Sequence, residues 1–290
     1  MPKQLISIGE LIDNSWEHYR RTIIDHLSIS CWLLVKALLD IIALALYPTV
    51  TTLATNAVLS PTEQAGIILF VLSNAVIAPL IGVWVLAGLV RLTRGQMMGR
   101  GDVRAAIKDA RAYFVPTLIV SVLLALILLA GLAIGFGPTL ILAGLGAWMN
   151  NGTLIILANV LLIFGVFVAF VINFRWSVYY VMSPYAVLLD DVGGTAALTR
   201  SRTLTQGRFW SVLARYALPK VVFVLFGLVA MGILSYIATL IVSAAAGLNL
   251  DVQLRLITIT SSVFPVAIAA VVNPLLVISD VMLYKSMTQK

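Results

Sequence analysis

The sequence predicts an all-α protein that crosses a membrane six times. Of its 290 residues, 61% are apolar and only 11% are charged, and the mean hydropathy is +1.05. A soluble globule would have nowhere to bury so much apolar surface, whereas a spanning helix exposes about 20 apolar residues to lipid. Six long apolar segments are separated by polar intervals, at about residues 27–54, 65–92, 115–142, 154–181, 216–245 and 256–284.

A weak repeat of about ninety residues is the second observation. In three polar intervals, matching positions recur with the i, i+3, i+4, i+7 spacing of one helix face. They are Ile8, Leu11, Ile12 and Ser15, then Val103, Ala106, Ile107 and Ala110, then Gly194, Ala197, Leu198 and Ser201. Two long apolar segments follow each set. We therefore predict a single membrane domain, 1–290, built as three repeats of an amphipathic interfacial helix and a transmembrane hairpin, at about 7–92, 101–182 and 190–284.

The first repeat opens with a helix over about residues 7–25, which places Trp16 and Tyr19 on one face. It lies either on lipid headgroups or on protein, and the sequence leaves both open. The first span carries Lys36 and Asp40, which lie four residues apart and therefore on one helical face. Charged residues inside a membrane usually mark functional sites, but this pair can also neutralise itself in a structural role.

The second repeat begins in the most basic interval, 91–111, where three glycines, Gly95, Gly99 and Gly101, are expected to end a helix before an amphipathic helix at 102–114. The third span starts near Pro116, which the first turn of a helix tolerates. In the same span, three further glycines would let a neighbouring backbone approach closely, namely Gly131, Gly135 and Gly137. The fourth span contains Asn173 and closes at Pro184.

The third repeat begins at Asp190 and Asp191, whose carboxylates would suit the N-terminal dipole of its amphipathic helix. The sixth span contains Asn273 followed by Pro274, and the proline leaves one backbone carbonyl of the helix without its usual donor. Asp280 lies near the same end of its span as Arg175 does in the fourth, which makes Arg175 a possible partner.

Loop charges predict the orientation, because positively charged loops stay in the cytoplasm. The basic residues concentrate in the intervals before each repeat, and Arg255 alone stands in the opposite loops, so both termini are predicted to be cytoplasmic. These basic intervals would meet anionic lipid headgroups through Arg91, Arg94, Arg100, Arg104, Arg200, Arg202 and Arg208. No basic stripe alternates with exposed aromatics, so nucleic-acid binding is not expected.

No catalytic, metal or cofactor motif stands out. The single cysteine, Cys31, excludes a cysteine cluster, and His18 and His26 lack an evident third ligand. We predict no enzyme activity, no metal and no cofactor. The best material for an internal polar path is a set of five residues within or near the spans: Lys36, Asp40, Asn173, Asn273 and Asp280. The alternative, which the sequence favours, is that such residues form structural hydrogen bonds between helices.

Three stretches resemble a prokaryotic family of membrane proteins that includes the membrane domain of glycerophosphodiester phosphodiesterases and the YciC-like proteins. They are GELIDNSWEHYRR at 9–21, FRWSVYYVMSPYAVLLDDVGGTAALTRSRTLTQGRFW at 174–210 and VMLYKSM at 281–287. In fused members the phosphodiesterase activity belongs to a separate soluble barrel, so no catalytic residue is carried over. The resemblance implies a multi-pass protein of the prokaryotic plasma membrane.

Two functions follow as hypotheses. The first is a non-catalytic scaffold or regulator whose cytoplasmic amphipathic helices meet anionic lipids and other membrane proteins. The alternative is a transporter or lipid-moving protein that uses the internal polar path.

Overall fold

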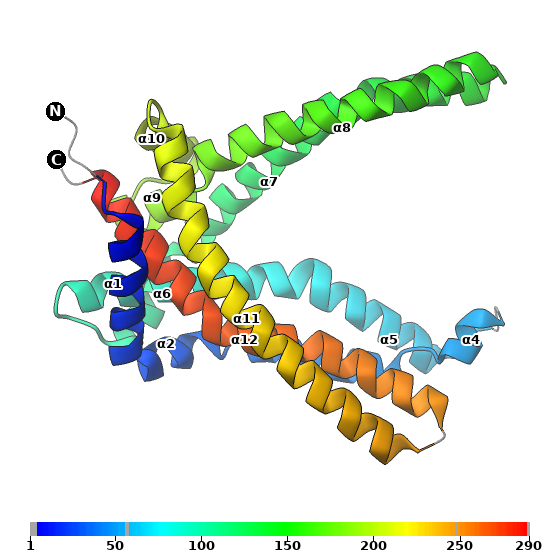
Figure 1. Ribbon diagram of the computed structural model, residues 1–290, viewed down its shortest axis with the longest axis horizontal. Helices are drawn as coiled ribbons and strands as arrows, with labels where there is room; N and C mark the ends of the chain where they lie inside the picture. Colours follow the sequence, from blue (N-terminus) through cyan, green and yellow to red (C-terminus); the bar gives the residue numbers. More distant parts are fainter. Residues whose placement is uncertain (1–4, 56–57, 248, 289–290) are drawn as a thin grey trace. The chain divides into compact units, whose positions relative to one another are not determined.

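A computed structural model describes residues 5–55, 58–247 and 249–288, and these residues form helices joined by short turns, without strands (Figure 1). Within these residues, five helical segments are long and apolar enough to cross a membrane, and the bent pair α2–α3 makes six if it counts as one span. The predicted all-α polytopic membrane protein is therefore confirmed. The elements are α1 Ile8–Arg21, α2 Ile23–Ser30, α3 Leu33–Leu46, α4 Val50–Ala54, α5 Pro61–Leu72, the π-helix η1 Ser73–Ile77, α6 Ala78–Met97, α7 Val103–Trp148, α8 Gly152–Tyr180, α9 Ser183–Asp190, α10 Gly194–Thr205, α11 Phe209–Ala246 and α12 Leu250–Thr288.

The chain divides into two compact units. Unit 1 comprises Met1–Phe114 and Ala214–Lys290, and unit 2 comprises Val115–Leu213. The long helices α7 and α11 each begin in one unit and end in the other. Each unit has its own packing and its own polar contacts.

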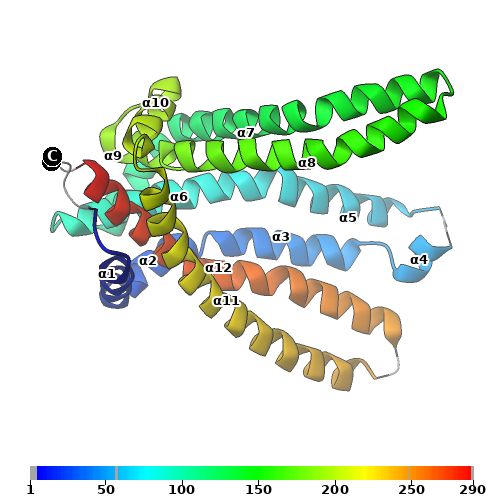
Figure 2. The same cartoon turned by 45° about the horizontal axis from the view of Figure 1, so that its top comes forward.

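In unit 1, α12 packs against α3, α1, α6 and α2. One apolar core joins α1, α11 and α12 through Tyr19, Phe223, Leu275 and Ile278. The Tyr19 hydroxyl also donates a hydrogen bond to the carbonyl of Val271, at 2.9 Å. Of the two possibilities left open by the sequence, α1 therefore packs one face on protein. Figure 2 shows α1 and the last turns of α12 at one end of the unit, with α4 at the other.

The first predicted span is broken. A bend of 41° separates α2 from α3 at Cys31–Trp32, and α3 ends before Pro48. The second span contains the π-helix η1, in which the hydrogen-bonded turn is one residue wider than in an α-helix. Helix α5 begins regularly at Pro61, because Ser60 and Glu63 form a reciprocal capping box.

The expected helix at 102–114 is not separate from the third span. Glycines end α6 at Met97 as predicted, but α7 then runs without interruption from Val103 to Trp148 through Pro116 and Pro138. A proline removes one backbone hydrogen bond from a helix, and the hydrogen bonds on either side of it keep the helix continuous. At 1.5 Å per residue, α7 is about 69 Å long and exceeds the hydrocarbon thickness of a bilayer by far, so part of it must lie outside.

In unit 2, α7 and α8 approach so closely that their glycines touch backbone. A Cβ atom at Gly165 would lie 2.4 Å from the Gly135 carbonyl oxygen, and one at Gly131 would lie 2.8 Å from the Asn173 amide. The close backbone approach predicted in this span is confirmed for Gly135. At Gly131 the close neighbour is the Asn173 side chain, and a Cβ at Gly137 would meet nothing within 4 Å.

Helices α8, α9 and α10 of unit 2 are joined by one buried serine. The Ser201 hydroxyl of α10 donates to the Tyr179 carbonyl at 2.7 Å and accepts from the Met182 N–H at 3.2 Å. Both partners lie at the break between α8 and α9, where the helical ladder leaves backbone groups unpaired. A single side chain therefore stabilises this break.

The carboxylates of Asp190 and Asp191 end α9 and do not begin α10, contrary to the prediction. Asp191 adopts a left-handed conformation with φ of 58°, which terminates α9, and α10 starts only at Gly194. Asp190 instead pairs with Arg200 of α10, with 2.9 Å between its Oδ2 and the arginine Nε.

Replacing Ser201 should destabilise unit 2 measurably. Ser201→Ala leaves the Met182 N–H and the Tyr179 carbonyl without this partner, at a cost of about 1–3 kcal/mol. Thr199→Ala is the matched control, because Thr199 is exposed and bonds only within α10. Denaturant unfolding in detergent measures the difference, and equal stability of the two variants would contradict the role given to Ser201.

Candidate functional site

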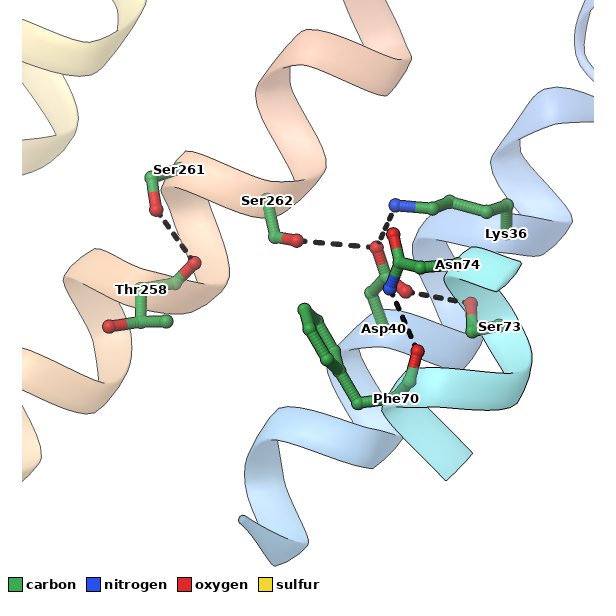
Figure 3. Close-up of polar contacts among 8 residues, drawn as sticks. All are labelled: Lys36, Asp40, Phe70, Ser73, Asn74, Thr258, Ser261 and Ser262. Carbon is green, nitrogen blue, oxygen red and sulfur yellow. Dashed lines mark hydrogen bonds and ion pairs between the residues drawn. The ribbon is translucent and has the colours of Figure 1, made fainter. Parts of the chain in front are cut away.

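Asp40 of α3 is a fully buried carboxylate within a candidate span. Its Oδ1 accepts a hydrogen bond from the Ser73 hydroxyl at 2.7 Å, and its Oδ2 accepts one from the Ser262 hydroxyl at 3.2 Å. Lys36, one turn earlier on α3, forms an ion pair with Oδ2. Figure 3 shows these donors converging on Asp40 from three helical segments, α3, η1 and α12. We call Lys36, Asp40, Ser73 and Ser262 the Asp40 cluster.

Local structure explains how the cluster forms. Lys36 and Asp40 share a face because they are separated by four residues of a regular helix. Ser73 is the first residue of the π-helix, a type of irregularity that recurs at functional sites. Ser262 precedes Pro265 by less than one turn of α12. Its neighbour Ser261 bonds within its own helix, to the Thr258 carbonyl (Figure 3).

The two serines were missed by the sequence analysis, which singled out Lys36 and Asp40. A serine inside a span carries no charge and has no periodic pattern, so only the packing of three helices reveals its partner. Asn74, directly after Ser73, is exposed and donates to the Phe70 carbonyl of its own helix at 2.9 Å. The amide of Asn74 is therefore not among the donors to Asp40.

A hollow of about 240 Å³ lies beside the Asp40 cluster in unit 1. Its polar lining comes from Lys36 and Asn273, and the remaining lining is apolar, with Pro265 among it. Asp40 does not line the hollow. Two of the five predicted path residues, Lys36 and Asn273, therefore line the same hollow. Asp40 lies outside the lining and is paired with Lys36.

Asp280, the fourth predicted path residue, belongs to a second ion pair of unit 1. Its Oδ1 pairs with the Lys220 ammonium of α11. The same ammonium lies 3.5 Å from the centre of the Tyr216 ring. Lys220 is the partner that the structure gives to Asp280, where the sequence analysis suggested Arg175.

These groups follow one face of α12. Arg255, Ser262, Asn273 and Asp280 are separated by 7, 11 and 7 residues, which are close to whole numbers of helical turns. At the other end from Asp280, the Arg255 guanidinium donates to the carbonyls of Ala45 and Tyr47, the latter at 2.8 Å. A cation is favourable there because these carbonyls end α3. The polar face of α12 therefore extends over about 37 Å.

Asn173, the fifth predicted path residue, lies in unit 2 and bonds locally. Its Nδ2 donates to the Ala169 carbonyl one turn earlier in α8, at 2.9 Å. The predicted path is thus divided, with Lys36, Asp40, Asn273 and Asp280 in unit 1 and Asn173 in unit 2.

The seven predicted headgroup arginines differ in exposure. Arg100, Arg104 and Arg202 are exposed, whereas the other four are partly buried. Among those four, Arg91 lies 3.6 Å from the centre of the Tyr113 ring, and Arg200 pairs with Asp190. Arg94 and Arg208 are the remaining two.

At the α1 end of unit 1, the two histidines join a polar network. His18 shares a hydrogen bond of 2.9 Å with the Gln96 side-chain oxygen, and the Gln96 amide donates to Asp25 at 3.2 Å. His26 is buried, with Nδ1 3.0 Å from the Thr22 carbonyl and Nε2 3.2 Å from the Thr93 hydroxyl. This network connects α1 and α2 to α6.

Comparison with protein-family models, curated proteins and solved structures finds no match. The resemblance noted from the sequence therefore stays a prediction, and the site is interpreted from its own chemistry.

The docking of α1 should weaken in mild acid. Burial lowers the pKa of His18 below its ordinary value of 6.5, and the charges of Lys285 and Arg21 lower it further, while the bond to Gln96 opposes them. As the pH falls, His18 therefore takes up a proton more readily in the undocked helix than in the docked one. Docking weakens as the pH falls from 6.5 toward the lowered pKa. Hydrogen exchange of the α1 amides, corrected for intrinsic rates, should become faster at pH 5.5 than at pH 7.5.

His18→Gln is the control, because glutamine keeps a hydrogen-bonding side chain and does not titrate in this range. In this variant the difference between the two pH values should largely disappear. An unchanged pH dependence would assign the effect to another group.

Proposed function

We propose that this integral membrane protein transports a small polar or charged solute and that the Asp40 cluster lies on the solute's path. A charged residue in a membrane interior is costly and is retained where it serves a function. The cluster also stands where three helical segments are irregular: the bend before α3, the π-helix η1 and Pro265 of α12. Interrupted helices of this kind surround the binding sites of many transporters.

The observation that carries the proposal is the position of Lys36. Its ammonium pairs with the buried Asp40, and Lys36 is also one of the residues that line the hollow of about 240 Å³. A solute in this hollow would meet a charge that is already held in place by the protein. An ion pair that served only to fasten helices together would need no such access.

Removing both charges together tests this proposal. The double variant Lys36→Met/Asp40→Asn keeps the side-chain volumes and leaves no unpaired charge, so it should fold in detergent with a thermal midpoint close to that of the parent protein. Uptake into liposomes containing the protein, measured with a panel of labelled amino acids, carboxylates, sugars and lipids, should fall at least tenfold to the level of empty liposomes.

Asn74→Ala is the matched control for uptake, because Asn74 lies in the same π-helix but its exposed side chain bonds only to Phe70. It should transport as the parent protein does. A folded double variant that retains full uptake would show that the ion pair is structural, and the absence of uptake by the parent for every solute class would reject the transport function.

A second candidate function is a membrane scaffold or regulator at an anionic lipid surface, in the plasma membrane of a prokaryote with both termini cytoplasmic. The observation that favours it is the exposure of Arg100 and Arg104 around the turn between α6 and α7. Each exposed arginine near an anionic surface contributes about 1 kcal/mol to lipid binding.

Arg100→Gln/Arg104→Gln should therefore lower the retention of anionic lipid on the purified protein by roughly tenfold or more at low salt, from the loss of about 2 kcal/mol. Native mass spectrometry after exchange into defined phospholipid measures the retention. Arg100→Lys/Arg104→Lys keeps both charges and should retain the lipid. If both double variants bind equally, these positions do not contact headgroups.

A further inference from the structure

We propose that the hollow beside Lys36 binds a small carboxylate-bearing anion together with one proton, which is taken up by Asp40. The proposal rests on the transport function above and names its substrate class and coupling ion. It follows from the size of the hollow, the sign of its charge and the arrangement of Asp40 behind Lys36.

The hollow is small, and its volume indicates how large a solute group it can hold. At about 30 Å³ for each water molecule of the liquid, a volume of about 240 Å³ corresponds to roughly eight water molecules. A solute of about six to eight non-hydrogen atoms fits this space.

The polar groups of the lining select an anion. Lys36 and Asn273 are the lining residues with polar side chains: the Lys36 ammonium is held by Asp40, and the Asn273 amide can donate two hydrogen bonds. Asp40, the counter-charge, has no exposed surface and lies outside the lining. A carboxylate in the hollow would therefore find a cation and an amide donor, with an apolar wall for the rest of its carbon skeleton.

The existing ion pair explains why a proton must accompany the anion. While Asp40 is ionised, its charge and that of Lys36 cancel, and an added carboxylate would leave one uncompensated negative charge in a medium of low dielectric. If Asp40 takes up a proton, the Lys36 ammonium becomes available to the solute carboxylate. The net charge of the site is then zero both before and after binding.

The surroundings of Asp40 suit such a change of protonation. Asp40 contacts Lys36 of α3, the Ser73 hydroxyl of η1 and the Ser262 hydroxyl of α12. Among the described residues, Lys36 is the one charged group in contact with it. A hydroxyl can donate or accept, so both serines stay bonded whether Asp40 is a carboxylate or a carboxylic acid. Because Asp40 does not line the hollow, the proton reaches it through Lys36: the ammonium passes one proton to Asp40 and takes one up from the hollow, and the reverse steps release it. No bond of the solute is broken.

Proteoliposomes with labelled pyruvate and lactate test the inference, with lactamide as the neutral analogue and ethanolamine as the cation. An inward proton gradient should accelerate pyruvate and lactate uptake at least tenfold over empty liposomes and leave the other two solutes unchanged. With potassium and valinomycin setting the membrane potential, the initial rate should not depend on that potential, because a proton and a monoanion move together.

Asp40→Asn separates the inference from a general transport role. The amide imitates the neutral carboxyl and leaves Lys36 free, so this variant should still exchange pyruvate for pyruvate across the membrane but should no longer respond to a proton gradient. Lys36→Met/Asp40→Asn, which lacks the ammonium, should do neither. Thermal stabilisation of the detergent-purified variants by pyruvate measures binding without transport. Pyruvate should stabilise Asp40→Asn at pH 7.5 and should not stabilise the double variant.

The outcomes distinguish the two proposals. Uptake of ethanolamine or of neutral solutes with no response from pyruvate, or loss of pyruvate exchange in a folded Asp40→Asn protein, overturns the anion–proton inference while transport stands. Absence of uptake for the whole panel, together with no stabilisation by pyruvate, overturns both.

Discussion

A carboxylate with no exposed surface has to find its counter-charge and its hydrogen-bond donors inside the helix bundle, and Asp40 finds them on three helical segments. Removing one partner of a buried ion pair costs about 3–5 kcal/mol, because the other charge is left uncompensated. The rotation of α3 about its axis and the positions of η1 and α12 beside it are therefore tied to this one group. Helix η1 supplies the Ser73 hydroxyl and α12 supplies the Ser262 hydroxyl, and both donate hydrogen bonds to Asp40.

Helix α12 carries several of the polar contacts of unit 1 along its length. Arg255 binds the end of α3, Ser262 meets Asp40, Asn273 borders the hollow, and Asp280 pairs with Lys220. The helix continues through Pro265 and Pro274, each of which lacks the backbone N–H that would close the ladder. One apolar-rich helix thus carries contacts of opposite kinds: apolar packing with Tyr19 and Phe223 on one side and a polar face on another.

The candidate site was partly predictable from the sequence, and the partners that were missed or predicted wrongly share one cause. The pairing of Lys36 with Asp40 follows from a spacing of four residues, because both partners belong to one helix. Ser73 and Ser262, 33 and 222 residues from Asp40, give no local signal. The partner of Asp280 was misjudged for the same reason, since Lys220 and Arg175 both stand near the ends of spans and only helix packing distinguishes them.

Segment boundaries show the same division between local and long-range information. The glycine break after Met97 and the close approach at Gly135 depend on a local run of glycines or on the absence of a side chain, and both were predicted from the sequence. The continuity of α7 through Pro116 and the end of α9 at Asp191 were not, because a proline or a carboxylate pair is compatible with more than one local structure.

From the amino-acid sequence alone follow the all-α class, the membrane location and the Lys36–Asp40 pair, because hydropathy and helical periodicity are properties of single segments. The tertiary structure decided which serines bind Asp40, which lysine meets Asp280 and which path residues share a unit. Those contacts depend on how each helix is rotated and shifted against its neighbours, and this is set by the packing of many side chains together.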